Sequence, residues 1–129
     1  MEQQTHCMVI DSQSETFEAL QYWFASQDSP VELYHAQTVD DARDAIDRLT
    51  PQIILIDIDD AEGQLLCGEL KSNPQFDDML VCGLSDGWDP QSLASALFQP
   101  NRADFYLRRP IDGVRLEQIL STALEKSSL

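Results

Sequence analysis

Two aspartates stand directly after short apolar runs, in positions where a carboxylate could do chemistry. Asp11 follows the run 7–10, and Asp57 follows the run 53–56. Continuous apolar runs of this length predict strands that are buried on both faces, as in the middle of a parallel sheet. Asp59 comes two residues after Asp57, so the loop is strongly acidic. Oxygen ligands with negative charge suit a hard cation such as Mg²⁺, whereas the alternative is a solvated acidic turn.

Two further predicted strands also lead to polar residues. The apolar run 79–84 leads to Ser85, and the segment 103–107 leads to Arg109. Because ligands bind at the carboxyl ends of the strands in an open α/β sheet, we expect acid, hydroxyl and cation to meet at one edge. Such a set of groups could hold a metal ion and a phosphoryl group.

Amphipathic helices are predicted between the strands. Apolar residues recur at helical spacing in 12–26, in 38–50 and in the segment that contains 116–124. Gly63 opens a third, short helix, and Asp89 opens a fourth that runs to about Phe98.

Cap signals and one alternating segment complete the expected topology. Ser12 and Glu15 have the S-x-x-E form of a capping box, and Thr38 with Asp41 offers a second cap. The alternating segment 31–36 predicts an edge strand. Five strands that alternate with five helices predict a doubly wound α/β fold with a five-stranded parallel sheet, as one domain over 1–129.

The charge of the chain argues against two classes of partner. Its net charge is −15, and it contains only eight Lys and Arg among 129 residues. Phosphate binding needs a basic face, so direct contact with nucleic acid is not expected. Anionic membranes are disfavoured for the same reason.

Cysteine usage and the N-terminal sequence indicate a cytoplasmic protein. Cys7, Cys67 and Cys82 are odd in number and scattered, which favours free thiols in a reducing compartment over disulfides or a zinc site. The opening residues 1–6 have no apolar signal region, and no run approaches the ~18 apolar residues of a membrane span.

The order of these features resembles the receiver domain of bacterial response regulators, of the chemotaxis-regulator kind, over essentially the whole chain. The stretch from Pro51 to Asp57 looks like the family's third strand, whose terminal aspartate accepts a phosphoryl group. The segment 78–86 is similar to its fourth strand, with Ser85 at the hydroxyl position.

The first and fifth strands carry the same resemblance. The segment 103–110 resembles the family's fifth strand, with Tyr106 at the aromatic switch position and Arg109 where the family has lysine. Asp11 matches the first of the family's paired acids. The resemblance implies a flavodoxin-like receiver fold with strand order 2-1-3-4-5.

The resemblance also implies site roles and partners. Asp57 would be the phosphoacceptor, with Ser85 and Arg109 beside it, and Asp11, Asp57 and Asp59 would hold Mg²⁺; Ser85 and Tyr106 would form the switch. The chain would not be an enzyme in its own right. Its partners would be a sensor histidine kinase or phosphotransfer protein, and an effector domain or partner protein reached through the face of helix four, strand five and helix five. That face could also form a homodimer.

Four departures from the family pattern mark an atypical site. Ser12 replaces the second acid of the pair, Arg109 replaces lysine, and Asp86 stands where a small residue is usual. The loop after Asp57 is shorter than usual and lacks its proline. Mg²⁺ binding is therefore expected to be weak. Mutual repulsion is also expected to raise the pKa values of the converging carboxylates, Asp11, Asp57, Asp59 and Asp86.

Three functions remain open at this point. The first is a receiver domain in two-component phosphorelay signalling, and the second is a pseudo-receiver that docks or dimerises without phosphorylation. The third is a flavodoxin-like electron carrier, because Ser12, Ser14 and Thr16 lie where a flavin phosphate would bind in that fold, although the loop lacks glycines. A hydrolase would need a general base, and only carboxylates are available.

Overall fold

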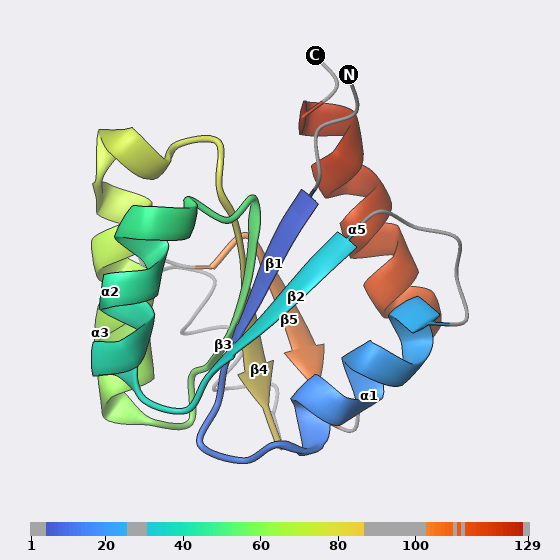
Figure 1. Ribbon diagram of the computed structural model, residues 1–129. Coiled ribbons are helices and arrows are strands. Elements are labelled where there is room, and N and C mark those ends of the chain that lie inside the picture. Colours follow the sequence, from blue (N-terminus) through green and yellow to red (C-terminus); the bar gives the residue numbers. More distant parts are fainter. Residues whose placement is uncertain (1–4, 26–30, 87–102, 110, 112, 128–129) are drawn as a thin grey trace.

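The computed structural model describes residues 5–25, 31–86, 103–109, 111 and 113–127, and within them it contains a five-stranded parallel sheet (Figure 1). The strand order is β2-β1-β3-β4-β5, as the resemblance implied. The strands are β1 (Thr5–Ile10), β2 (Val31–Ala36), β3 (Ile53–Asp57), β4 (Leu80–Ser85) and β5 (Phe105–Arg108). Their bounds confirm the predicted strands to within two residues.

Helices cover both faces of the sheet. The described helices are α1 (Glu15–Ala25), α2 (Val39–Leu49), α3 (Ala61–Ser72) and α5 (Gly113–Ser127), with a 3₁₀ turn at Pro74–Phe76. Figure 1 shows α2 and α3 on one face and α1 and α5 on the other. The helix expected over 90–98 lies outside the described residues.

The helix starts differ in their agreement with the sequence. Thr38 caps α2 as predicted, because its Oγ1 accepts a hydrogen bond from the N–H of Asp41 at 3.1 Å. The capping box at Ser12 is wrong as a helix start, since α1 begins at Glu15. The start predicted at Gly63 is late, because Asp60 caps α3 through a hydrogen bond from the N–H of Glu62.

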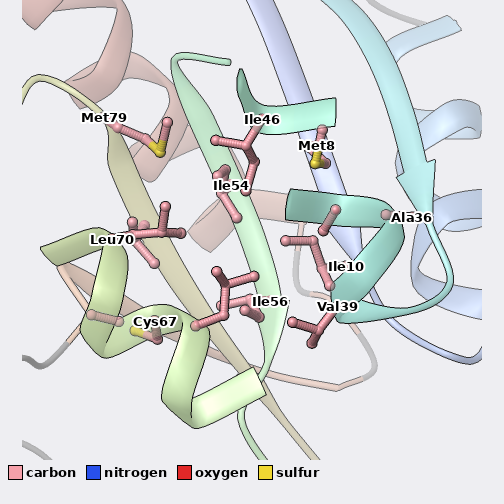
Figure 2. Packing of buried hydrophobic residues seen from close by; sticks show 14 residues of the cluster. Met8, Ile10, Ala36, Val39, Ile46, Ile54, Ile56, Cys67, Leu70 and Met79 are labelled. Carbon is pink, nitrogen blue, oxygen red and sulfur yellow. The ribbon is translucent and has the colours of Figure 1, made fainter. Parts of the chain in front are cut away.

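The central strand is buried on both faces, and two apolar clusters result. Ile54 and Ile56 belong to the cluster under α2 and α3, shown in Figure 2, while Leu55 belongs to the cluster under α1 and α5. This double burial is what the continuous apolar run predicts. The three cysteines are buried free thiols, and burial raises the pKa of Cys67 to about 11 and that of Cys82 to about 12. These two thiols are therefore protonated and unreactive at neutral pH.

The strand register brings the carboxyl ends of the strands level. Ile10 pairs with Ile56, Asp57 pairs with Leu84, and Ser85 pairs with Arg108. Asp11 and Arg109 each follow one residue after these pairs. The polar residues that the sequence places after the strands are therefore held at one edge by the backbone ladder.

Gly63 is needed for the close approach of α3 to the end of β3. A Cβ atom at this position would lie 1.9 Å from the backbone oxygen of Asp57 and 3.6 Å from the Ile56 side chain. Backbone cannot yield as a flexible side chain can, so the residue that looked like a helix start is a packing requirement.

Gly63→Ala should therefore destabilise the fold by about 2–4 kcal/mol, because α3 must move away from Asp57. Leu65→Ala, at a side chain on the same helix that is 62% exposed, should change the free energy of unfolding by under ~1 kcal/mol. Chemical denaturation of both variants measures the two values. Equal stability of the variants would show that the close approach costs nothing.

Candidate functional site

Asp11, Asp57, Ser85 and Arg109 meet at the carboxyl edge of the sheet, as their places after the strands predicted. We call this edge the acidic site; it comprises Asp11, Asp57, Asp59, Ser85, Asp86 and Arg109. Asp57 and Ser85 are the last residues of β3 and β4, and Asp11 and Arg109 directly follow β1 and β5. Asp59 comes from the loop after β3, and Asp86 follows β4.

The guanidinium group of Arg109 lies at the centre of the acidic site. Its Nη1 atom is 2.7 Å from Asp11 Oδ2, and its Nε atom is 2.7 Å from Asp86 Oδ1. Its Nη2 atom is 3.2 Å from Asp57 Oδ1 and 3.3 Å from Asp59 Oδ2. One planar cation thus contacts four carboxylates, which its fork of N–H donors allows.

A second set of hydrogen bonds fixes the Asp59 carboxylate. Its Oδ1 atom accepts from the hydroxyl of Ser85 at 2.7 Å, and its Oδ2 atom accepts from the backbone N–H of Asp86 at 2.9 Å. Ser85 is only 1% exposed, so its hydroxyl needs this partner. The predicted site hydroxyl therefore holds a carboxylate that belongs to the site itself.

The backbone also orients the two strand-end aspartates. Asp57 Oδ1 accepts from the N–H of Asp59 at 2.9 Å, and Asp11 Oδ1 accepts from the N–H of Gln13 at 3.1 Å. Asp11 is 3% exposed, and a nearly buried charge is stable only when it is paired. Its Oδ2 atom receives that pairing from Arg109.

The charges shift the pKa values in opposite directions, so the expectation of a uniform rise is wrong. Burial, together with the charge of Asp11, raises the pKa of Asp57 despite hydrogen bonds from Asp59 and Arg109. Burial also acts on Asp59, but the donors at Asp86, Ser85 and Arg109 outweigh it and lower that pKa. Burial opposes the charge on Arg109, yet the carboxylates around it raise its pKa. The hydrogen bonds and the charge of Arg109 therefore outweigh burial at Asp59 but not at Asp57.

The carboxylates do not fit a divalent ion in this arrangement. One carboxylate oxygen of each residue implied as a Mg²⁺ ligand, Asp11, Asp57 and Asp59, lies within 3.3 Å of an Arg109 nitrogen. In the part of the chain that the structure describes, no three His, Cys, Asp or Glu side chains are grouped so that they could hold a metal ion. Ser12, which stands where the family has a second acid, is exposed beside Asp11.

Tyr106 is half-buried on β5 and packs over a glycine. A Cβ atom at Gly83 on β4 would lie 3.0 Å from the Tyr106 ring and 3.1 Å from the Ile58 side chain. Ile58 is the residue directly after Asp57. The aromatic residue predicted as a switch is therefore packed against the loop that leaves the acidic site, and its switching role stays a prediction.

His35 is a neighbour of the acidic site that the sequence reasoning missed. Its place on a predicted edge strand indicates a surface histidine, but its ring is half-buried and stacks on Phe17 with centroids 4.8 Å apart. Its Nε2–H donates to the backbone oxygen of Asp11 at 2.9 Å. The signal that could have found it is its place near the carboxyl end of β2, next to the strand that delivers Asp11.

Comparison with solved structures decides the fold. The signal receiver domain of a DNA-binding response regulator from Colwellia psychrerythraea superposes with a TM-score of 0.80 at 16% identity, over 94% of this chain and 98% of the other. A two-component response regulator from Legionella pneumophila gives 0.78 at 16% identity, over 95% and 99%. The signal receiver domain of a histidine kinase from Syntrophus aciditrophicus gives 0.75 at 21% identity, over 94% and 90%.

The fold is that of a receiver domain. No protein-family model matches the sequence, and no curated protein matches it significantly. In an open α/β sheet ligands bind at the carboxyl ends of the strands, which is the edge where the acidic site lies. None of the described helices has the length and apolar character that a membrane span needs.

The raised pKa of Asp57 predicts a pH-dependent effect of its neutralisation. A raised folded pKa means that the ionised carboxylate destabilises the fold, and that this cost disappears below the ordinary pKa of 3.8. Asp57→Asn keeps the Oδ1 acceptor and should therefore raise the melting temperature at pH 7 by a few degrees. The gain should shrink as the pH falls through the raised pKa.

Thermal melts from pH 7 to pH 4 measure this effect, with Asp44→Asn on the exposed surface of α2 as the matched control. The control removes the same charge without touching the acidic site. A loss of stability in Asp57→Asn at pH 7 would contradict the prediction, as would a gain that does not change with pH.

Proposed function

We propose that the chain is a receiver domain of two-component signalling that regulates a partner protein by docking, without a need for phosphorylation at Asp57. The observation that carries this proposal is the contact of Arg109 with all four carboxylates of the acidic site. The role is regulation of a partner and not turnover of a substrate. It is the pseudo-receiver alternative that the sequence left open.

The geometry disfavours attack by Asp57 on a phosphodonor. Asp57 Oδ1 already accepts hydrogen bonds from the N–H of Asp59 and from Arg109 Nη2, so this oxygen is engaged within the chain itself. Asp86 is 71% exposed and bound to Arg109 Nε, so its negative charge lies on the solvent side of the site. An anionic phosphodonor would meet this charge first.

A hollow beside the site supports the same interpretation. It has a volume of about 200 Å³ and is lined by Arg109 and Asp86 together with residues of the loop before α1, of α1 and of the segment before α5. Its lining does not include Asp57. A molecule that entered there would contact the ion pair of Arg109 and Asp86, and not the candidate phosphoacceptor.

The proposed partner is an effector domain or protein of the signalling system, or the sensor kinase itself. Solved proteins with this fold include a DNA-binding response regulator and a histidine kinase, which suggests both types of partner for this chain. The docking face would be helix four, β5 and α5. Its described part includes the half-buried Tyr106, whereas Phe98 and the side chain of Leu124 lie outside the described residues. A homodimer through this face is the alternative partner, in the cytoplasm that the composition favours.

Phosphorylation of Asp57 remains the second candidate, because its side chain is still 18% exposed at the end of β3. Intact mass after incubation with acetyl phosphate and Mg²⁺ separates the two. The wild-type chain should gain no phosphoryl adduct. The variant Ser12→Asp, Asp86→Ala, Arg109→Lys should gain one, because it supplies a metal ligand, removes the outer charge and frees Asp57.

Two controls make the mass experiment decisive. Adding Asp57→Asn to the triple variant should abolish the adduct, and Arg43→Lys, on exposed α2, should behave as the wild type. A wild-type chain that is labelled as fast as the triple variant would show that the pseudo-receiver proposal is wrong. A triple variant that folds and stays unlabelled would place the remaining defect in the short loop 57–63.

A further inference from the structure

We propose that Arg109 is the resident cation of the acidic site, and that its guanidinium takes the place of a divalent metal ion among Asp11, Asp57 and Asp59. The inference deepens the proposed function and rests on the same contacts. It assigns a different property, which is that a cation of the chain itself partly balances the charge of the site and orders its carboxylates. The fold of the wild-type chain then needs no metal ion, because Arg109 occupies the place of the ion and not only because Ser12 replaces a metal ligand.

The donor pattern of Arg109 matches this role. Its three nitrogen atoms address carboxylates that reach it from different strands and loops: Nη1 contacts Asp11, Nη2 contacts Asp57 and Asp59, and Nε contacts Asp86. A Mg²⁺ ion would draw the first three oxygens to about 2.0–2.1 Å from one point, which cannot happen while the guanidinium lies between them. The cation and the metal ion therefore compete for the same oxygen atoms.

Burial makes the guanidinium hard to displace. The Arg109 side chain is 11% exposed and that of Asp11 is 2% exposed, so this pair is largely removed from solvent. Asp59 is held in turn by the Ser85 hydroxyl and the Asp86 N–H. A metal ion that entered would have to expel a charged group and rearrange a hydrogen-bonded carboxylate.

The formal charge of the acidic site also depends on Arg109. Four carboxylates and one guanidinium carry a formal charge of −3, counted from the four ion pairs of Arg109. Without Arg109 the charge would be −4, in a site that holds the nearly buried Asp11. Removal of Arg109 should therefore do two things at once: destabilise the fold and create a site that attracts a divalent ion.

The test compares Arg109→Gln with Arg43→Gln. Arg43 is also paired with a carboxylate, that of Glu69, but its side chain is 42% exposed and lies on α2, away from the acidic site. Both changes add one unit of negative charge to a chain of net charge −15, so non-specific attraction of cations is equal. Arg109→Lys is the milder variant, because a compact ammonium cannot reach all four carboxylates.

Mn²⁺ binding is followed by electron paramagnetic resonance, and melting temperature is measured with 0–10 mM MgCl₂ at constant ionic strength. The wild type and Arg43→Gln should show no saturable binding and no metal-dependent shift. Arg109→Gln should melt at least ~5 °C lower than the wild type without metal, and MgCl₂ should restore part of the loss. Arg109→Lys should show saturable Mn²⁺ binding, at least about tenfold tighter than the weakest affinity that the measurement can detect.

Each result supports or overturns the inference. Saturable Mn²⁺ binding by the wild type that Asp11→Asn abolishes would overturn it. It would also be overturned if the Arg109→Gln and Arg109→Lys variants fold but neither bind Mn²⁺ nor melt at a different temperature with MgCl₂. If Arg109→Gln is unfolded without metal, the Lys variant decides.

The outcome is separable from that of the proposed function. A wild type that binds Mn²⁺ and gains no phosphoryl adduct would contradict this inference and leave the proposed function standing. A wild type that is phosphorylated but binds no Mn²⁺ would contradict the proposed function and leave this inference standing.

Discussion

The guanidinium of Arg109 is the one group on which the carboxyl edge of the sheet depends. Parallel strands bring their ends together, and here carboxylates come from the end of β3 and from residues that follow β1, β3 and β4. Removing one partner from a largely buried ion pair costs about 3–5 kcal/mol, because it leaves an uncompensated charge. An exposed pair such as Arg43 with Glu69 is worth under ~1 kcal/mol. Of the ion pairs in the described chain, that of Arg109 with Asp11 is the most deeply buried.

The fold could be predicted from the sequence because its signals are local. Four apolar residues before Asp57, three of them β-branched, predict a strand covered on both faces, and β3 is buried in that way. The Thr38 cap and the apolar spacing of α2 also lie within one turn or a few turns of helix, so the sequence contains all that is needed to recognise them. The same holds for the convergence of the strand-end residues, since it follows from the parallel topology.

The contacts inside the acidic site could not be predicted, because they are decided between residues far apart in the chain. Arg109 and Asp11 are 98 positions apart, and the sequence places both at one edge without saying which carboxylates the cation contacts. The lowered pKa of Asp59 depends on donors from Ser85 and Asp86, which outweigh the burial that local reasoning anticipates. Gly63 was interpreted as a helix start for the same reason, since its contact with the Asp57 backbone is visible only after α3 packs.

The packing of Tyr106 brings the face proposed for output close to the residue that follows Asp57. Glycine in the middle of a strand normally weakens it, yet Gly83 is covered by the Tyr106 ring and by Ile58, which directly follows Asp57. Tyr106 lies three residues before Arg109, the first on β5 and the second just after it. The aromatic ring and the residue after Asp57 therefore meet over Gly83, while the guanidinium contacts the carboxylates at the end of the same sheet. Under the proposed function, Arg109 holds the four carboxylates in one arrangement without a chemical event, which is the property that a docking module needs.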